Sequence, residues 1–193
     1  MDKVLYFAYG ANRDIKMMQA ITGSSELKGK PATLKGYSLY VQRLDQVPDT
    51  VSENSPAPIS PRDLLKESWP DTFTSYIIKE DPEGEVDGVV WKLTPLQREL
   101  VRDWELVDFG WYGDINTEVT LEDGQNVKVQ TEGLRPGQNV DRKVDGKDYE
   151  TWLNDPSDFE RVANKAREEY FERTELSPEG KVKPEDLGIP SKK

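Results

Sequence analysis

Two short stretches of the sequence combine residue types that can bind or transform a small molecule. The first is Tyr9-Gly10-Ala11-Asn12, where a short apolar segment ends in a glycine turn. Glycine adopts positive φ without strain, and asparagine tolerates it better than most residues. Successive N–H groups of such a turn can converge on one point and bind a carboxylate or phosphate. The alternative is a purely structural turn in which Asn12 caps the following helix.

The second stretch ends at Glu105, just before the aromatic turn 109–112. Leu96, Leu100 and Trp104 are spaced four apart and predict the buried stripe of a helix. A helical wheel places Glu105 roughly 120° from the centre of that stripe, so periodicity alone indicates a solvated side chain. A glutamate that faces a sheet from a helix end would instead have its pKa raised by desolvation. It could then exchange protons with a ligand.

The composition excludes several classes of chemistry. The 193 residues include no histidine and no cysteine, so the usual Ser-His-Asp and Cys-His mechanisms and Cys/His zinc sites are impossible. The net charge of −11 argues against general binding to nucleic acid or to an anionic membrane. No apolar run approaches the roughly 18 residues of a membrane helix. We therefore expect a cytoplasmic protein.

The elements that would position these residues follow from hydrophobic patterning. We predict strands over 3–9, 32–44, 72–79, 86–93, 111–121 and 126–132, and helices over 13–21, 95–105, 147–153 and 157–171. Gly36 marks a bulge or a point of close approach, Asp81-Pro82-Glu83-Gly84 is a candidate turn, and Asp123-Gly124 predicts a hairpin. Thr94 with Pro95 and Gln97 forms a capping-box pattern.

The segment 45–71 holds five of the thirteen prolines and is predicted to be a long loop with one helical turn at 62–66. Strands do not alternate with long helices, which argues against a doubly wound parallel sheet. The order of elements instead predicts an α+β fold, a small mixed, mostly antiparallel β-barrel with flanking helices. We expect one domain over residues 1–172 and a polar tail over 173–193.

Together, the glycine turn and the helix ending at Glu105 resemble the γ-glutamylcyclotransferase and AIG2-like superfamily. Its first strand reads roughly Y-F-A-Y-G-S-N, and residues 6–12 match at every position except Ala11. A later family strand, G-V-V-W-x-[LM], is matched by residues 88–93, and the following glutamate helix by 101–106. The resemblance covers about residues 3–153.

The resemblance implies a γ-glutamylcyclotransferase-like barrel and a specific set of site residues. Glu105 would be the catalytic acid/base, and the glycine turn would hold the γ-glutamyl group. Tyr112 would shape the pocket floor, and Tyr149 is the best match to a later site tyrosine of the family. The implied substrate-binding residues are Tyr6, Phe7, Ala8, Tyr9, Gly10, Ala11, Asn12, Tyr112 and Tyr149.

The implied reaction releases 5-oxoproline from a γ-glutamyl amino acid, peptide or amine by intramolecular aminolysis. It requires no cofactor and no metal, and the expected partner is that small molecule, bound by a monomer or homodimer. The chain departs from the family at Ala11, Arg13 and Leu106, and it lacks the family's C-terminal G-A-x-x-x-G-L-P pattern. A non-catalytic small-ligand module, or an interaction domain that binds through 45–71, are the alternatives.

Overall fold

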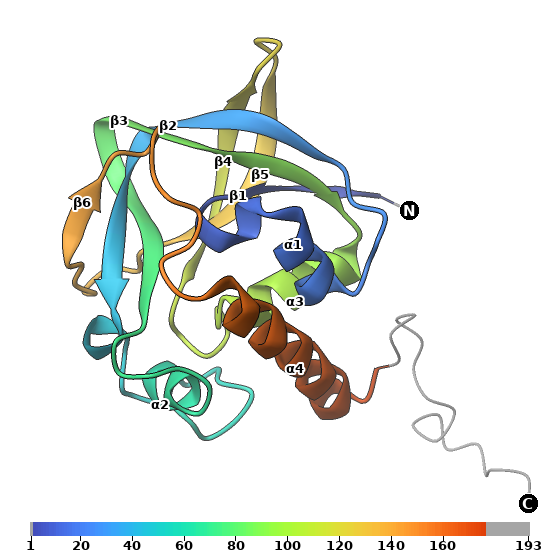
Figure 1. Cartoon of the computed structure of the whole chain (residues 1–193), viewed down its shortest axis with the longest axis vertical. Helices are drawn as coiled ribbons and strands as arrows, with labels where there is room; N and C mark the ends of the chain where they lie inside the picture. Colours follow the sequence, from blue (N-terminus) through green and yellow to red (C-terminus); the bar gives the residue numbers. More distant parts are fainter. Residues whose placement is uncertain (1, 177–193) are drawn as a thin grey trace, which may run out of the picture.

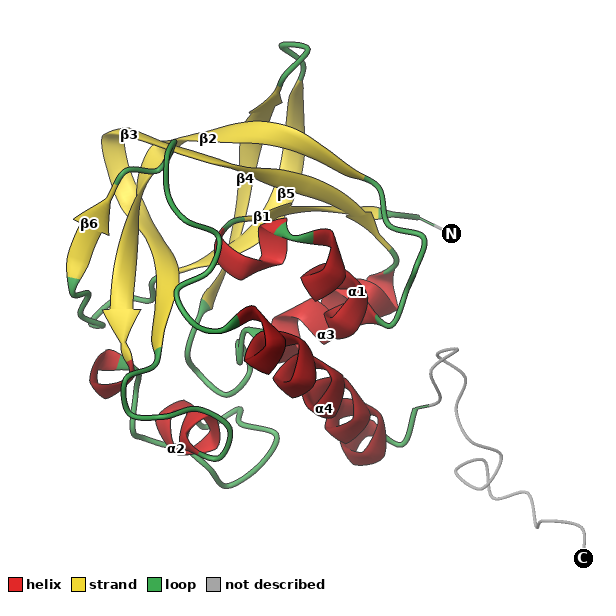
Figure 2. Cartoon of the chain, viewed as in Figure 1, coloured by secondary structure: helices red, strands yellow, loops and turns green. Residues whose placement is uncertain are grey.

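A closed barrel of five strands forms the body of the computed structural model, which describes residues 2–176 (Figure 2). The strands follow the order β3-β1-β5-β4-β2, and β2 pairs back to β3. Only β1 and β5 are parallel; every other barrel pair is antiparallel. This confirms the predicted mixed, mostly antiparallel barrel. The barrel strands are β1 (Val4–Ala8), β2 (Gly29–Arg43), β3 (Thr74–Leu93), β4 (Gly113–Leu121) and β5 (Asn126–Gly133), and β6 (Arg142–Val144) adds to β2.

The helices flank the barrel rather than alternate with its strands (Figure 1). Three of them, α1 (Ile15–Thr22), α3 (Pro95–Trp104) and α4 (Pro156–Thr174), pack against one another beside the barrel. The short α2 (Pro61–Lys66) lies in the long loop between β2 and β3. Two single turns of 3₁₀ helix, η1 (Gly10–Arg13) and η2 (Leu44–Gln46), follow β1 and β2.

Two apolar clusters hold these layers together. One takes a buried residue from each barrel strand: Phe7, Leu34, Ile78, Val119 and Val129. This is the alternation expected when every other side chain of a strand points to the same face. The other cluster lies between barrel and helices and includes residues of α1, α3, α4 and the loop around α2. The helices therefore cover an apolar outer face of the barrel.

The predicted turn at Asp81-Pro82-Glu83-Gly84 is wrong, because β3 is one continuous strand through it. The register runs from Lys35 opposite Glu85 to Tyr37 opposite Glu80, so residues 81–84 bulge opposite Gly36. A Cβ atom on Gly84 would lie 2.2 Å from the carbonyl oxygen of Tyr37. Proline and glycine here bend the strand around the barrel instead of reversing it. The predicted bulge at Gly36 is confirmed.

Two helix predictions also need correction. Residues 147–153 form an irregular segment rather than a helix. The segment is held by a tertiary contact, in which the Tyr149 hydroxyl donates to the carbonyl oxygen of Asp87 at 2.7 Å. The N-cap of α1 is Asp14, whose Oδ1 accepts from the amides of Lys16 and Met17 at 2.8 and 3.1 Å. Asn12 is therefore free for another role.

The helix that carries Glu105 forms as predicted. Thr94 and Gln97 make the reciprocal capping box, and Glu105 is the C-cap. The next residue, Leu106, has φ of 49°, the left-handed conformation that glycine adopts most easily. The helix predicted at 157–171 corresponds to α4. Most of the predicted tail, residues 177–193, lies outside the described residues.

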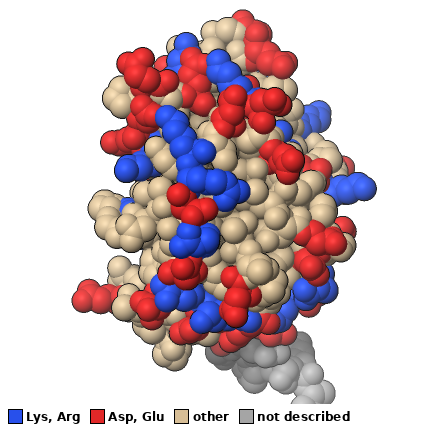
Figure 3. All heavy atoms as spheres, turned by 60° about the vertical axis from the view of Figure 1, so that its left-hand side comes forward, with Lys and Arg blue, Asp and Glu red and all other residues tan. Residues whose placement is uncertain are grey.

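The surface carries mixed charge. On the face shown in Figure 3, acidic and basic side chains are interspersed with uncharged ones. Within residues 2–176, no helix combines the length and the apolar content needed to cross a bilayer.

The capping box at the start of α3 gives a test of the fold. Replacing Thr94 with alanine removes the acceptor of the Gln97 amide at 3.1 Å, and we expect a loss of about 1 kcal/mol in the free energy of unfolding. Thr94→Ser keeps the hydroxyl and should lose much less. Urea denaturation of both variants measures the difference, and equal losses would contradict the capping role.

Candidate active site

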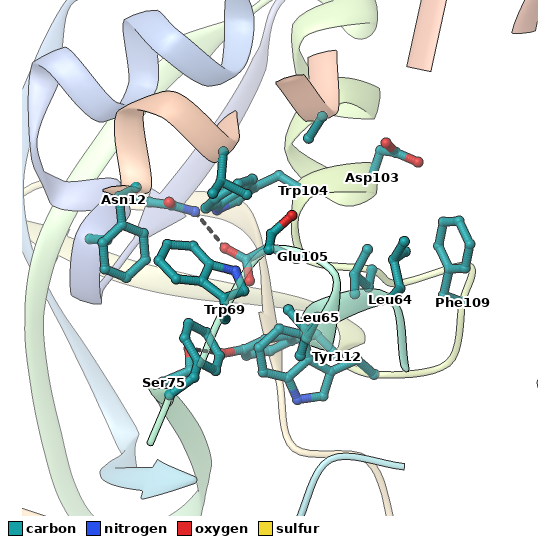
Figure 4. A pocket seen from close by; sticks show the side chains of 18 of the residues that line it. Asn12, Leu64, Leu65, Trp69, Ser75, Asp103, Trp104, Glu105, Phe109 and Tyr112 are labelled. Atoms are coloured by element: carbon teal, nitrogen blue, oxygen red, sulfur yellow. Dashed lines mark hydrogen bonds between the residues drawn. The ribbon is translucent and has the colours of Figure 1, made fainter. Parts of the chain in front are cut away.

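A cavity of about 190 Å³ lies between the end of β1, the C-terminal end of α3, the loop around α2 and α4. Figure 4 shows Glu105 in its middle, with Asn12 on one side and Tyr112 on the other. The glycine turn and Glu105, which are far apart in the sequence, therefore face one space. The sequence-predicted residues that line the cavity are Tyr6, Tyr9, Gly10, Ala11, Asn12, Glu105 and Tyr112.

A short hydrogen bond joins these two parts of the site. Nδ2 of Asn12 donates to Oε1 of Glu105 at 2.6 Å and to the hydroxyl of Tyr6 at 3.0 Å. Asn12 is buried, with 2% of its surface exposed. The backbone carbonyl oxygen of Asn12 accepts a hydrogen bond from Nε1 of Trp91 at 2.9 Å. Backbone and side chain of Asn12 are thus both fixed, and its amide holds the Glu105 carboxylate in place.

Glu105 is half-buried because part of it faces the cavity. Loss of hydration raises the pKa of its carboxyl to about 8, and the negative charge of Glu132 contributes to this rise. The hydrogen bond from Asn12 and the positive charge of Arg98 act in the opposite direction. Glu105 can therefore both accept and release a proton near neutral pH.

Glu132, on β5, is a second cavity residue and was not predicted from the sequence. Only 2% of its surface is exposed, and its Oε1 lies 2.5 Å from Nη1 of Arg98 on α3, which is buried as well. Burial raises the pKa of the Glu132 carboxyl, and the positive charge of Arg98 opposes that rise. Negative charge on Glu132 in turn raises the pKa of Glu105. Because side chains alternate between the two faces of a strand, Glu132 is expected on the face of β5 opposite to that of Val129 and Thr131. No pattern in the sequence indicates that it would pair with Arg98.

Tyrosines and a serine complete the polar wall. The Tyr112 hydroxyl donates to the carbonyl oxygen of Tyr76 at 2.5 Å and lies 2.9 Å from Oγ of Ser75. The hydroxyl of Tyr9 donates to the backbone oxygen of Glu132 at 2.6 Å. Burial raises the pKa of Tyr9 and Tyr112, so both stay neutral hydrogen-bonding groups.

Three residues of the predicted site do not line the cavity. Phe7 packs in the barrel interior and Ala8 in the cluster under the helices. Tyr149 lies behind the glycine turn, where its hydroxyl accepts from the amide of Gly10 at 3.4 Å. The guanidinium of Arg13 lies 4.3 Å from the centre of the Tyr149 ring. Tyr149 thus supports the turn from outside and occupies one amide that the turn would offer a ligand.

Apolar residues that were not predicted also line the cavity. The loop between β2 and β3 supplies Leu64, Trp69 and Phe73, and the turn after α3 supplies Phe109. Figure 4 shows Leu64, Trp69 and Phe109 around Glu105. The sequence signal for the loop was its proline content and length, which indicated a functional or disordered segment. Its apolar residues fall irregularly, so no periodicity showed that they would face Glu105.

Comparisons with known proteins support the fold. The chain is similar to a solved structure described as a gamma-glutamyl cyclotransferase, at 20% identity and a TM-score of 0.54, over 97% of this chain and 98% of that one. It is equally similar to the structure of an uncharacterised protein from Homo sapiens, at 18% identity, a TM-score of 0.54 and 98% coverage of both chains. No protein-family model and no curated protein matches the chain. The resemblance seen in the sequence is confirmed by these structures as a γ-glutamylcyclotransferase-like fold.

The raised pKa of Glu105 predicts a pH-dependent stability difference. The pKa of the Glu105 carboxyl is about 8 in the folded protein and about 4.3 in the unfolded chain. The folded protein therefore binds this proton more tightly. The wild type should therefore lose stability relative to Glu105→Gln as pH rises from about 4.3 to about 8, by up to about 1.4 kcal/mol per pH unit.

Denaturant unfolding at a series of pH values measures this difference. The matched control is Glu118→Gln, an exposed glutamate on β4. Its stability curve should run parallel to that of the wild type above pH 5. A parallel curve for Glu105→Gln as well would show that burial does not hold the proton on Glu105.

Proposed function

We propose that the protein is a γ-glutamylcyclotransferase-type enzyme that releases 5-oxoproline from a small γ-glutamyl molecule. The observation that carries this proposal is the Glu105 carboxylate, held by Asn12 in one cavity with the glycine turn. The fold shared with a gamma-glutamyl cyclotransferase supports it. The residues of the turn are those that the sequence resemblance assigns to the γ-glutamyl group.

The chemistry needs only one proton-transferring side chain. The α-amino nitrogen of the substrate attacks its own side-chain carbonyl carbon, forming a C–N bond and a five-membered ring. The bond from that carbon to the leaving nitrogen then breaks. Glu105 takes one proton from the α-ammonium group so that the neutral amine can attack, and a second proton leaves the same nitrogen as the lactam N–H forms. Both protons pass in turn through Glu105 to the departing nitrogen, which leaves as an ammonium group, so protons balance over the cycle. The cavity contributes by selecting a folded conformer of the substrate, a proximity effect.

The pKa of Glu105 suits both halves of this cycle. Proton transfer is most effective when donor and acceptor are closely matched. A model α-amino group titrates at about 8, and Glu105 is raised to about 8. An ordinary glutamate would be a much weaker base toward the same ammonium group. The environment of Glu105 thus supports acid–base chemistry over binding alone.

The turn at Gly10 to Asn12 would bind the α-carboxylate or the developing oxyanion. The first amides of a helical turn have no acceptor within that turn. The amide of Gly10 already donates to Tyr149, so Ala11 and Asn12 are the proposed backbone donors. This use of backbone groups explains how the site can work with alanine at position 11, where the family has serine.

Removing the carboxylate of Glu105 tests the proposal directly. We expect Glu105→Gln to lose 5-oxoproline release by at least about a hundredfold, because general acid–base catalysis contributes about 10²–10⁴-fold. The assay incubates the protein with γ-glutamyl amino acids, peptides and amines and measures 5-oxoproline. Glu99→Gln, on the exposed face of the same helix, is the matched control and should keep full activity.

Absence of release from every substrate, or full activity of Glu105→Gln, would refute the proposal.

The pH profile provides a second test. Glu105 must be ionised to accept the first proton, so kcat/KM should fall tenfold per pH unit below about pH 8. Glu132→Gln removes a negative charge that raises the pKa of Glu105, so the fall in kcat/KM should begin at a lower pH in this variant. In Glu118→Gln the fall should begin at the same pH as in the wild type. An acidic limb near pH 4 in the wild type would contradict the assignment of Glu105.

A further inference from the structure

A buried arginine of α3 contacts three side chains on one face of the barrel. Arg98 is 3% exposed, and its Nε donates to Oε1 of Gln130 at 2.9 Å. Its Nη1 lies 2.5 Å from Oε1 of Glu132, and its guanidinium carbon lies 5.0 Å from the centre of the Tyr6 ring. Tyr6 and Gln130 are register partners in the parallel strands β1 and β5, so Glu132, two residues further along, shares their face. The pairing of these strands thus brings Tyr6 and Glu132 together beside Arg98.

The hydroxyl of Tyr6 has one proton, and that proton is directed at Glu132. The hydrogen bond from Tyr6 lowers the pKa of the Glu132 carboxyl, as a donor to a carboxylate does. Arg98 lies beside the same carboxyl and carries only donors, so it too requires an acceptor there. Burial raises the pKa of Tyr6, so the hydroxyl keeps its proton. Towards Asn12, the Tyr6 oxygen can therefore only accept.

Asn12 continues this chain of hydrogen bonds to Glu105. Its Nδ2 donates to the Tyr6 hydroxyl at 3.0 Å and to Oε1 of Glu105 at 2.6 Å (Figure 4). Both hydrogens of the NH2 group are thus used. Turning the amide over would place its oxygen against the Tyr6 oxygen, whose proton points elsewhere. The direction of the Tyr6 hydroxyl therefore selects which end of the Asn12 amide faces Glu105.

We propose that Tyr6 is a positioning residue for the acid–base step, which keeps the NH2 group of Asn12 directed at Glu105. The pair of Arg98 and Glu132 orients the Tyr6 hydroxyl, and Tyr6 acts on Glu105 through Asn12. Because Oε1 of Glu105 accepts from Asn12 throughout, Oε2 exchanges protons with the substrate. This inference rests on the proposed function. It assigns Tyr6 a role other than the substrate contact that the sequence resemblance implies.

Tyr6→Phe tests this role, because it keeps the ring beside Arg98 and removes the hydroxyl. For γ-glutamyl compounds that the wild type converts, we expect kcat to fall about tenfold or more, since a misplaced catalytic group costs up to about a hundredfold. KM should change less than about threefold, because no contact with the bound substrate is lost. Tyr37→Phe is the matched control and should change neither constant, since Tyr37 is a half-buried residue of β2 that does not line the cavity.

The pKa of Glu105 provides a second reading, which needs no substrate. The hydrogen bond from Asn12 lowers this pKa, so loss of the Tyr6 hydroxyl should raise it. The stability of Tyr6→Phe relative to Tyr6→Phe/Glu105→Gln should then keep falling beyond pH 8, where the fall ends for the wild type relative to Glu105→Gln. We expect the end of the fall to move by up to about one pH unit. Urea unfolding at a series of pH values measures both differences.

This pH reading separates positioning from charge and from general damage to the fold. Tyr6→Phe removes no charge, since Glu132 and Arg98 still act on Glu105. The other charged residues that line the cavity also remain: Glu67, Asp103, Lys165, Glu169 and Arg173. A variant that only loosened the fold would lose stability equally with and without Glu105, and the end of the fall would stay in place.

A second variant breaks the chain of hydrogen bonds at its other end. Arg98→Met/Glu132→Leu replaces the buried pair with apolar side chains, an exchange that often leaves stability unchanged. It removes the acceptor of the Tyr6 proton, so we expect the same fall in kcat as in Tyr6→Phe. Adding Tyr6→Phe to this variant should cause little further loss, because the effects of residues in one network are not additive.

The outcomes distinguish this inference from the function on which it rests. A higher KM with unchanged kcat in Tyr6→Phe, or an unmoved end of the stability fall, overturns the inference and leaves the function intact. Additive losses of kcat in the combined variant also overturn it. If the wild type releases no 5-oxoproline, the proposed function fails, and the stability reading alone then confirms or overturns the chain from Tyr6 to Glu105.

Discussion

A hydrogen bond from Asn12 holds the Glu105 carboxylate in the candidate site. The position of Asn12 depends in turn on how β1 pairs with β3. Tyr6 and Trp91 are direct partners in the register of these strands. Tyr6 accepts a hydrogen bond from the Asn12 side chain, and Trp91 donates one to its carbonyl oxygen. A slip of β1 by one residue would turn the ring of Tyr6 to the other face of the sheet and away from Trp91. Strand pairing in the barrel therefore determines where the carboxylate at the end of α3 is held.

Two carboxyl groups in different surroundings, the buried Glu132 and the half-buried Glu105, line the same cavity. Glu132 is paired with Arg98, whose charge opposes the rise that burial causes in the pKa of Glu132, while Glu105 faces the cavity with an amide as its hydrogen-bond donor. Like charges in a poorly hydrated space are unfavourable together, so negative charge on Glu132 adds to the rise in the pKa of Glu105.

Local signals predicted the elements well, and contacts between distant residues were harder to predict. The capping box at Thr94, the hairpin at Asp123-Gly124 and the helical turn near residue 62 all rest on bonds within a few residues, and all formed. The candidate N-cap role of Asn12 is wrong, because Asp14 caps the helix, whereas the prediction that Asn12 belongs to the site agrees with its place in the cavity wall. Periodicity alone predicts a solvated Glu105. Its position at the helix end left a desolvated carboxyl open, and the family resemblance favoured that alternative. The pairing of Arg98 with Glu132 and the apolar wall depend on barrel closure, which no local pattern encodes.

Leu106 shows how the chain holds its helix end where the family uses glycine. Its left-handed backbone costs roughly 1–2 kcal/mol for a residue with a Cβ atom, and such strain persists only where surrounding contacts enforce it. The side chain is buried, and the Leu106 carbonyl oxygen accepts from the amide of Trp111. A glycine there would relieve the strain and also free the helix end to fray. The leucine thus restricts the motion of Glu105 in the free protein. The conformational entropy of Glu105 is therefore lost when the chain folds and not when a ligand binds.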